Sequence, residues 1–152
     1  MKAMRRADRL MHADESQKLL TNGEYGILST TDAHGQPYAT PLNYVYWNDS
    51  IYFHCATTGA KLDNIRTNDK VCFTIVGKTK VLPDQFATNY ESVMAFGVAS
   101  QVDGPEKLDA LEALIQKYSP EYIPQGKEYI ERAKDKTVVI RITIDHCTGK
   151  RR

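Results

Sequence analysis

Apolar and polar positions alternate over most of this chain, and the pattern predicts mainly β structure. Residues 138–145 are the clearest case, because every second position from Val138 to Ile144 is branched and apolar, which is the period of two that a strand imposes. Other segments rich in β-branched and aromatic residues predict strands at 25–30, 37–47, 51–55, 70–76 and 92–102. Turn clusters at 32–35 and 48–50 join the first three of them into consecutive hairpins.

Apolar residues at helical spacing predict helices between these strands. The first begins at Asp14, where Gln17 completes a capping box, and ends at Gly23. A longer helix starts at Pro105 and carries an apolar stripe as far as Tyr118. Shorter helices are expected at 60–66 and, with a weaker pattern, at 126–133.

The remaining segments have no clear period. Residues 77–89 contain Pro83 and predict a loop that covers part of the molecule, and the polar residues 146–152 predict a tail. The basic residues within 1–13 predict a solvated leader. Within the strand at 92–102, Gly97 predicts a bend or a bulge of the kind that closes a barrel.

Six antiparallel strands with only one strand-helix-strand crossover predict a small β-barrel with peripheral α-helices. A doubly wound sheet would need more crossovers. The 152 residues are expected to form a single domain, since single cores usually run to about 100–200 residues.

Composition narrows the function classes. Twenty lysines and arginines against nineteen acids create no global field for nucleic acid or an anionic membrane, so neither partner is expected. No apolar run is long enough to span a membrane and no signal-peptide core follows the basic start. Cys55, Cys72 and Cys147 have no metal-site or disulfide spacing, so we expect no metal and a cytoplasmic protein.

The chain lacks the usual hydrolase and nucleotide-binding motifs, but the strand-to-helix junction at 54–61 has phosphate-binding chemistry. Amides from Gly59 to Lys61 lie at a helix N-terminus, Thr58 offers a hydroxyl and Lys61 a positive charge. An ordinary helix capped by Thr58, with Lys61 in solvent, explains the same residues. Local chemistry alone favours this simpler interpretation over a phosphate site.

Two neighbouring features fit a nucleotide-like ligand. His54 ends an aromatic strand directly before the junction, and Asn43 lies on the neighbouring strand. Pro41 cannot donate to a strand ladder, so the backbone there is expected to be irregular, with exposed amides and carbonyls that can bind a planar heterocycle.

The order of motifs along the chain resembles the 5-nitroimidazole-resistance (Nim) branch of the pyridoxamine 5'-phosphate oxidase-like flavoproteins. The resemblance rests on the leader at 4–6, Pro41 to Val45, Ile51 to Ala56 with Gly59 and Lys61, and Asn68 to Phe73. Further matches are Ser92 to Gly97, Lys117 to Pro120 and His146 to Lys150. Together they cover nearly the whole chain.

The resemblance implies an FMN-binding split barrel that forms a homodimer with the cofactor at the interface. It places the FMN phosphate at Thr58 and Lys61 and the isoalloxazine ring along the backbone of two segments, with position 92 also close to the cofactor. The implied cofactor-binding residues are Ala39, Thr40, Pro41, Leu42, Asn43, His54, Cys55, Ala56, Thr58, Lys61 and Ser92. His146 to Lys150 would also lie near the flavin of one subunit.

This resemblance also implies an oxidoreductase that passes electrons from a reduced nicotinamide or another donor through FMN to a small planar acceptor, such as a nitroimidazole. His54 is the candidate catalytic residue, in an orienting or proton-donating role. Ala60 stands where true pyridoxamine 5'-phosphate oxidases usually carry an arginine, which argues against vitamin B6 oxidation. The alternatives are a flavin-binding module without turnover and a barrel that binds heme or a deazaflavin.

Overall fold

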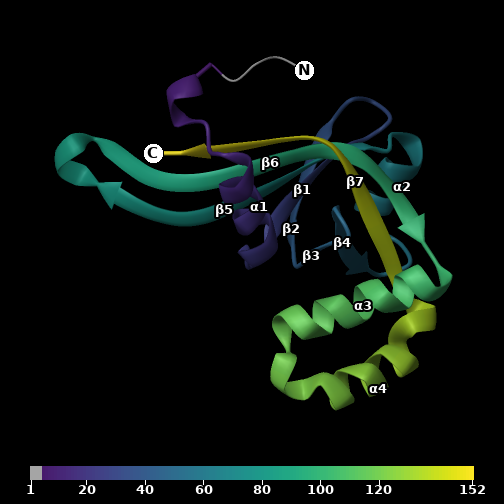
Figure 1. The fold of residues 1–152 in the computed structure, drawn as a ribbon. Coiled ribbons are helices and arrows are strands. Elements are labelled where there is room, and N and C mark those ends of the chain that lie inside the picture. The colour runs from purple at the N-terminus through teal and green to yellow at the C-terminus, as the bar shows by residue number, and fades with distance from the viewer. Residues whose placement is uncertain (1–4) are drawn as a thin grey trace.

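A computed structural model describes residues 5–152 as one antiparallel sheet with four α-helices (Figure 1). Residues 1–4 of the expected leader lie outside the described residues. The strands are β1 (Gly26–Thr31), β2 (Pro37–Leu42), β3 (Val45–Trp47), β4 (Ser50–Cys55), β5 (Lys70–Leu82), β6 (Ala87–Val102) and β7 (Val138–Arg151). The helices are α1 (Ala13–Asn22), α2 (Ala60–Thr67), α3 (Gly104–Tyr118) and α4 (Ile123–Ala133). Short 3-10 turns occupy Ala7–Arg9, Pro83–Gln85, Pro120–Tyr122 and Lys134–Lys136.

The sheet curls into a split barrel. Its strand order is β2-β1-β5-β6-β7-β4-β3, so the two edge strands, β2 and β3, are consecutive in the chain. Only Asn43 and Tyr44 separate them, and this short step brings the two edges of the sheet together at one point. The predicted class, a mainly β barrel with peripheral helices, is confirmed.

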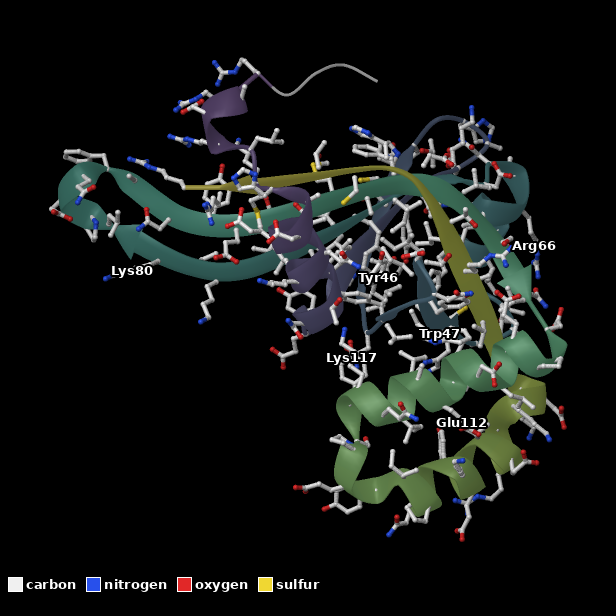
Figure 2. All side chains as sticks on the ribbon, in the orientation of Figure 1. Tyr46, Trp47, Arg66, Lys80, Glu112 and Lys117 are labelled. Atoms are coloured by element: carbon white, nitrogen blue, oxygen red, sulfur yellow. The ribbon has the colours of Figure 1, made fainter. Side chains whose placement is uncertain are left out.

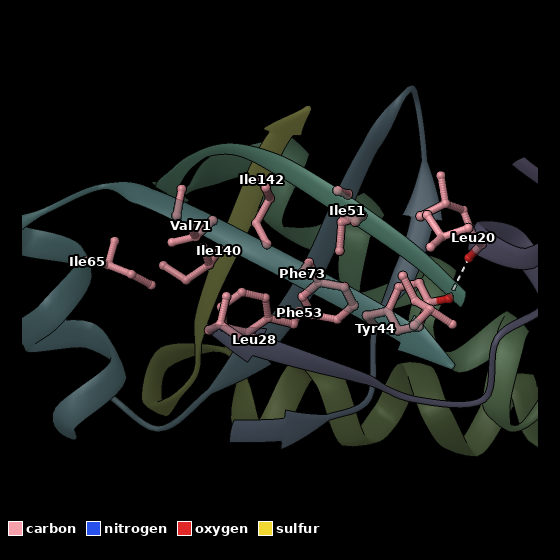
Figure 3. Close-up of a cluster of buried hydrophobic side chains, with 14 of the residues drawn as sticks. Leu20, Leu28, Tyr44, Ile51, Phe53, Ile65, Val71, Phe73, Ile140 and Ile142 are labelled. Carbon is pink, nitrogen blue, oxygen red and sulfur yellow. Dashed lines mark hydrogen bonds between the residues drawn. The ribbon is translucent and has the colours of Figure 1, made fainter. Parts of the chain in front are cut away.

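The barrel interior is filled by one face of each strand, as the period of two requires. Phe53, Phe73, Ile140 and Ile142 are almost completely buried there, and Figure 3 shows them side by side. Burying such side chains contributes about 2–3 kcal/mol each. This cluster is the core that holds the sheet in its curved form.

Two expectations about irregular segments were wrong. Residues 77–89 are not a loop, because β5 and β6 continue outward as a long hairpin with Thr79 opposite Tyr90. Residues 146–152 are not a free tail, since β7 pairs with β6 as far as Arg151, opposite Glu91. The hairpin beyond Val76 has no fully buried residue until Val93, and in the β7 extension only Cys147 packs against the core and Gly149 is buried, so the apolar alternation that reveals a strand is absent and the backbone ladder defines both extensions.

Smaller differences concern element ends. The expected strand at 37–47 is interrupted at Asn43–Tyr44 and forms β2 and β3, in line with the irregularity inferred from Pro41. The first helix is capped by His12 rather than Asp14, because the Glu15 carboxylate accepts the His12 backbone N–H at 3.0 Å. That reciprocal bond fills the role expected of Gln17.

The α3–α4 helical hairpin, residues 104–133, packs on the outer face of the sheet. Leu111 and Leu114 of α3 join a second buried cluster with Val45, Tyr52 and other strand residues. The Glu106 carboxylate accepts hydrogen bonds from the Tyr52 phenol and from Arg141, both at 2.9 Å. Apolar burial and this polar contact together fix α3 against β4 and β7.

The C-terminal end of α3 clamps the step between β2 and β3. The Tyr118 phenol oxygen accepts the Tyr44 backbone N–H at 3.0 Å and donates to the Glu24 carbonyl at 2.7 Å. The Tyr44 phenol in turn donates to the Leu20 carbonyl at 2.6 Å (Figure 3). The Tyr118 phenol thus satisfies a backbone group at the strand interruption, and the Tyr44 phenol satisfies a carbonyl in the last turn of α1.

Lys117 points from α3 toward the barrel (Figure 2), and its ammonium lies 3.8 Å from the centre of the Tyr44 ring. The Nζ atom is buried and has no hydrogen-bond partner. Burial lowers the pKa of Lys117 from 10.5 to about 8, so this lysine opposes folding while it is charged.

Gly97 is the position where the barrel bends, and we expect it to tolerate no side chain. The β6–β7 register shifts between Phe96 and Gly97, and a Cβ at Gly97 would meet the Thr143 carbonyl oxygen at 2.0 Å. Gly97→Ala should lower the free energy of unfolding by about 2 kcal/mol or more. Gly77→Ala is the matched control, since its Cβ would meet side-chain atoms and no backbone, namely the flexible end of Leu19 at 2.9 Å and the Glu91 Cβ at 3.3 Å; equal losses in urea unfolding would contradict the assignment.

Replacing the buried lysine should remove a pH-dependent penalty. Between pH 8 and 10.5 the unfolded chain holds a proton on Lys117 that the folded chain has lost, so this residue makes stability rise with pH in that window. We expect Lys117→Met to stabilise the protein by about 1–2 kcal/mol at pH 7 and to lose that gain by pH 10. Urea unfolding at several pH values checks this, with Lys127→Met on the exposed side of α4 as control.

Candidate functional site

The opening in the barrel follows from the strand register. β3 pairs with β4 so that Val45 faces Tyr52, and the same register continued along the chain would set Asn43 opposite His54 and Pro41 opposite Ala56. β2 pairs with β1 instead. The segments 39–43 and 54–58 therefore diverge beyond the β3–β4 pairing, and we call the region that they border the split.

The first side of the split, residues 39–43, is a strand with one exposed face. Ala39, Pro41 and Asn43 are exposed, whereas Thr40 and Leu42 are half-buried. The Thr40 hydroxyl oxygen is buried without a hydrogen-bond partner. Since buried hydroxyls are normally bonded, the Thr40 hydroxyl is a free group that a ligand in the split can satisfy.

The second side begins with His54 and Cys55, which point to opposite faces of β4. Cys55 packs against the barrel core, and burial raises the pKa of its thiol against the opposing effect of the Lys61 ammonium. His54 is on the exposed face, where partial burial of the ring lowers the pKa of the imidazole. At pH 7 the site therefore presents a neutral imidazole and a protonated thiol.

The α2 N-terminus follows directly and has no side-chain cap. The N-cap residue is Gly59, with φ of 139°, so Thr58 does not cap the helix as the simpler interpretation required. A side chain at Gly59 would meet nothing within 4 Å, which shows that the backbone is accessible here. The first-turn amides of Ala60 and Lys61 thus face open space beside a cationic side chain, an arrangement that attracts an anion.

A buried polar chain holds α2 in place relative to the first side of the split. The Asn64 amide donates to the Thr30 hydroxyl at 3.0 Å, and that hydroxyl donates to the Tyr38 carbonyl at 3.4 Å. It connects α2, β1 and β2. Sequence reasoning missed Asn64 and Thr30, and the only available signal was a polar residue on the apolar face of the short helix.

Tyr118 is a second residue that positions the split and for which the sequence predicted no role at the site. Its phenol fixes the backbone of Tyr44, the residue after Asn43. The first side of the split is thus anchored at one end by α3 and along its length by β1. Both anchors join residues far apart in the chain, which is why no local pattern reveals them.

Ser92 lies far along the sheet from the second side of the split. His54, Val139 and Val102 lie in one row across β4, β7 and β6, and Ser92 is ten residues from that row along β6, a path of about 33 Å at the rise of a strand. It lies closer in register to the first side, because Thr40, Leu28, Phe73 and Ala95 form one row across β2, β1, β5 and β6, and Ser92 is three residues from Ala95. His146 to Lys150 pair with β6 from Phe96 to Ser92, so they too lie far from His54.

The split combines the groups needed to hold a phosphorylated heterocycle. An uncapped helix N-terminus and Lys61 suit a phosphate, while exposed main chain at Ala39, Pro41 and Asn43 offers donors and acceptors along an extended edge. The Thr40 hydroxyl adds one further polar group. FMN has these parts in the same order, so the residues present fit it.

A match to a protein-family model and similarity to solved structures both support the fold. The family model described as pyridoxamine 5'-phosphate oxidase matches residues 12–151. A search of curated protein sequences finds no match. Among solved structures, a Bacteroides thetaiotaomicron protein whose name proposes a role in 5-nitroimidazole antibiotic resistance is 23% identical with a TM-score of 0.76, over 93% of this chain and 85% of that one.

Two Mycobacterium smegmatis structures are also similar. The protein described as FAD-binding is 25% identical with a TM-score of 0.66, covering 93% of this chain and 96% of its own. The protein described as binding FAD and heme is 16% identical with a TM-score of 0.80, over 92% of this chain and 71% of its own. The split barrel and the family match over nearly the whole chain show that this protein belongs to the pyridoxamine 5'-phosphate oxidase family.

Proposed function

We propose that this protein binds FMN in the split and acts as an oxidoreductase. The proposal rests chiefly on one observation: the α2 N-terminus, which has no side-chain cap and has Lys61 in its first turn, directly follows the segment of β4 from which the β2–β3 strand diverges. The phosphate would bind at the amides of Gly59 to Lys61 and at the Thr58 hydroxyl. The ring would lie between the two sides of the split.

The residues of the chain have distinct tasks in this proposal. Bound FMN would supply the electron-transfer chemistry. Main-chain groups of Ala39 to Asn43 and of His54 to Ala56 would orient the ring and adjust its potential. His54, a neutral imidazole on the exposed face of β4, would orient a small planar acceptor such as a nitroimidazole or deliver a proton to it.

We infer a homodimer as part of this proposal. Ser92 and the segment from His146 to Lys150 lie far along the sheet from His54 of their own chain. In the proposed assembly a second copy supplies them to the ring, and the cofactor lies at a subunit interface.

A heme-binding barrel is the second candidate, and the similarity to the FAD- and heme-binding protein of Mycobacterium smegmatis favours keeping it. Its axial ligand would come from His54 or His146, both exposed. The absorbance spectrum of the purified protein separates the candidates. Two broad flavin absorbance bands, together with FMN released from the protein on denaturation, support the proposal. A Soret band, FAD released on denaturation, or a protein that does not bind added FMN would refute it.

Lys61 should contribute directly to cofactor affinity. We expect Lys61→Ala to weaken FMN binding by about 1–3 kcal/mol, the scale of a lost charge-assisted hydrogen bond. Fluorescence titration of apoprotein with FMN measures the change. Lys70→Ala, at the exposed start of β5, is the matched control, and an equal effect of both variants would place the phosphate elsewhere.

Turnover distinguishes an enzyme from a flavin-binding module. We expect NADH or NADPH to reduce the bound flavin without oxygen, and a nitroimidazole to reoxidise it. His54→Ala should slow reoxidation by about 10²-fold or more, the usual scale of lost proton transfer, with FMN affinity little changed. A reduced flavin that no nitroimidazole or quinone reoxidises would identify a module without turnover.

A further inference from the structure

The long β5–β6 hairpin is the core of a protrusion that we call the basic arm: residues 76–91, the end of β7 at 147–152 and the N-terminal turn at 5–9. A bridge between Leu10 and Lys150 attaches the N-terminal turn to β7. Arg9, Tyr90 and Arg152 line one hollow of about 500 Å³. Three segments far apart in the sequence therefore form a single surface.

The outer part of the basic arm has no core of its own. Beyond the pairing of Glu91 with Arg151 it consists of two strands only, and such a ribbon is marginally stable alone. Its apolar side chains nevertheless point into solvent: the exposed fraction is 98% for Phe86 and 68% for Val81. Phe86 also has a φ of 49°, a left-handed conformation that is costly for a bulky residue. An exposed aromatic side chain in this setting suggests a surface that is covered in use.

The charges of the molecule are divided between the basic arm and the rest. The arm carries eight lysines and arginines against three acids, whereas residues 10–75 and 92–146 carry eleven against sixteen. A formal charge of +1 for the whole chain conceals this division. The two parts are complementary in sign, which favours a second copy of the same chain as the partner.

The shape fits the same partner. Figure 1 shows the β5–β6 hairpin and the α3–α4 helical hairpin leaving the barrel in different directions, as two limbs of an L. A twofold rotation of an L onto itself brings each limb against the other limb of its partner. The helical hairpin has exposed aromatic side chains at Tyr122 and Tyr129 and exposed acids at Glu121 and Glu128, which match the apolar tip and the lysines of the arm.

We propose that the basic arm of one copy packs against the α3–α4 helical hairpin of a second copy, with Phe86, at the tip of the β5–β6 hairpin, at the centre of the contact. Lys78 and Lys80, the latter labelled on the arm in Figure 2, face Glu121 and Glu128 of that helical hairpin. Two identical contacts form around the twofold axis. The inference deepens the proposed function, since it names the surfaces that assemble the dimer.

Sedimentation velocity of the full chain over a range of concentrations tests the contact. We expect Phe86→Ser, and separately the pair Lys78→Glu with Lys80→Glu, to raise the dimer dissociation constant at least about tenfold. The matched control is Arg66→Glu with Lys70→Glu, two exposed cations outside the arm, which should leave dimerisation unchanged. Adding Glu121→Lys and Glu128→Lys to the arm reversal should restore at least part of the lost affinity.

Several results would overturn the inference: a monomeric wild type, arm variants that dimerise normally, equal losses from the control pair, or an absence of rescue. Wild-type chain that uses the arm to bind anionic vesicles or an oligonucleotide while remaining monomeric would also overturn it. FMN titration of the wild type separates this test from the proposed function. A chain that dimerises through the arm without binding FMN refutes only the function, and a dimer that binds FMN but ignores the arm variants refutes only the contact.

Discussion

The change of partner at Asn43–Tyr44 is the constraint on which the candidate site depends. One polypeptide segment starts as β2 beside β1 and continues as β3 beside β4, so the two edges of the sheet meet at a point and diverge from it. Backbone groups at the divergence have no strand partner. The Tyr118 phenol supplies one, and it does so from a helix more than seventy residues further along the chain. This bond and the buried core fix the point at which the two strands diverge.

A second consequence of the divergence is the accessibility of the α2 N-terminus. If the β3–β4 ladder continued, its next residues would cover the segment before the helix. Because β2 turns away, Gly59 and the amides after it stay exposed. Asn64 then ties the same helix to β1 through Thr30. The site is thus made of exposed backbone held by buried side chains, an arrangement that preorganises a binding site without placing many reactive groups in it.

The distribution of charge over the folded molecule is not visible in its composition. An almost neutral chain separates into a basic arm and an acidic remainder, and the separation appears only when the N-terminal turn, the β5–β6 hairpin and the end of β7 are brought together. The first residues, predicted as a solvated leader, contribute Arg9 to this surface. Neighbouring charges on a surface, rather than their total, decide which partner a protein attracts.

The sequence by itself determined the elements in which buried and exposed side chains alternate regularly. The inner strands, α3 and the bend at Gly97 were predicted because burial imposes a period of two or 3.6 on apolar residues and because only glycine fits a close backbone approach. The junction at 54–61 was singled out because its polar and charged groups lie close together in the chain, and the resemblance to the family made it the candidate phosphate site. Only the tertiary structure decided the arm, the continuation of β7 and the clamp by Tyr118. Their physical basis is backbone pairing and contact between distant residues, which leave no periodic trace in the sequence.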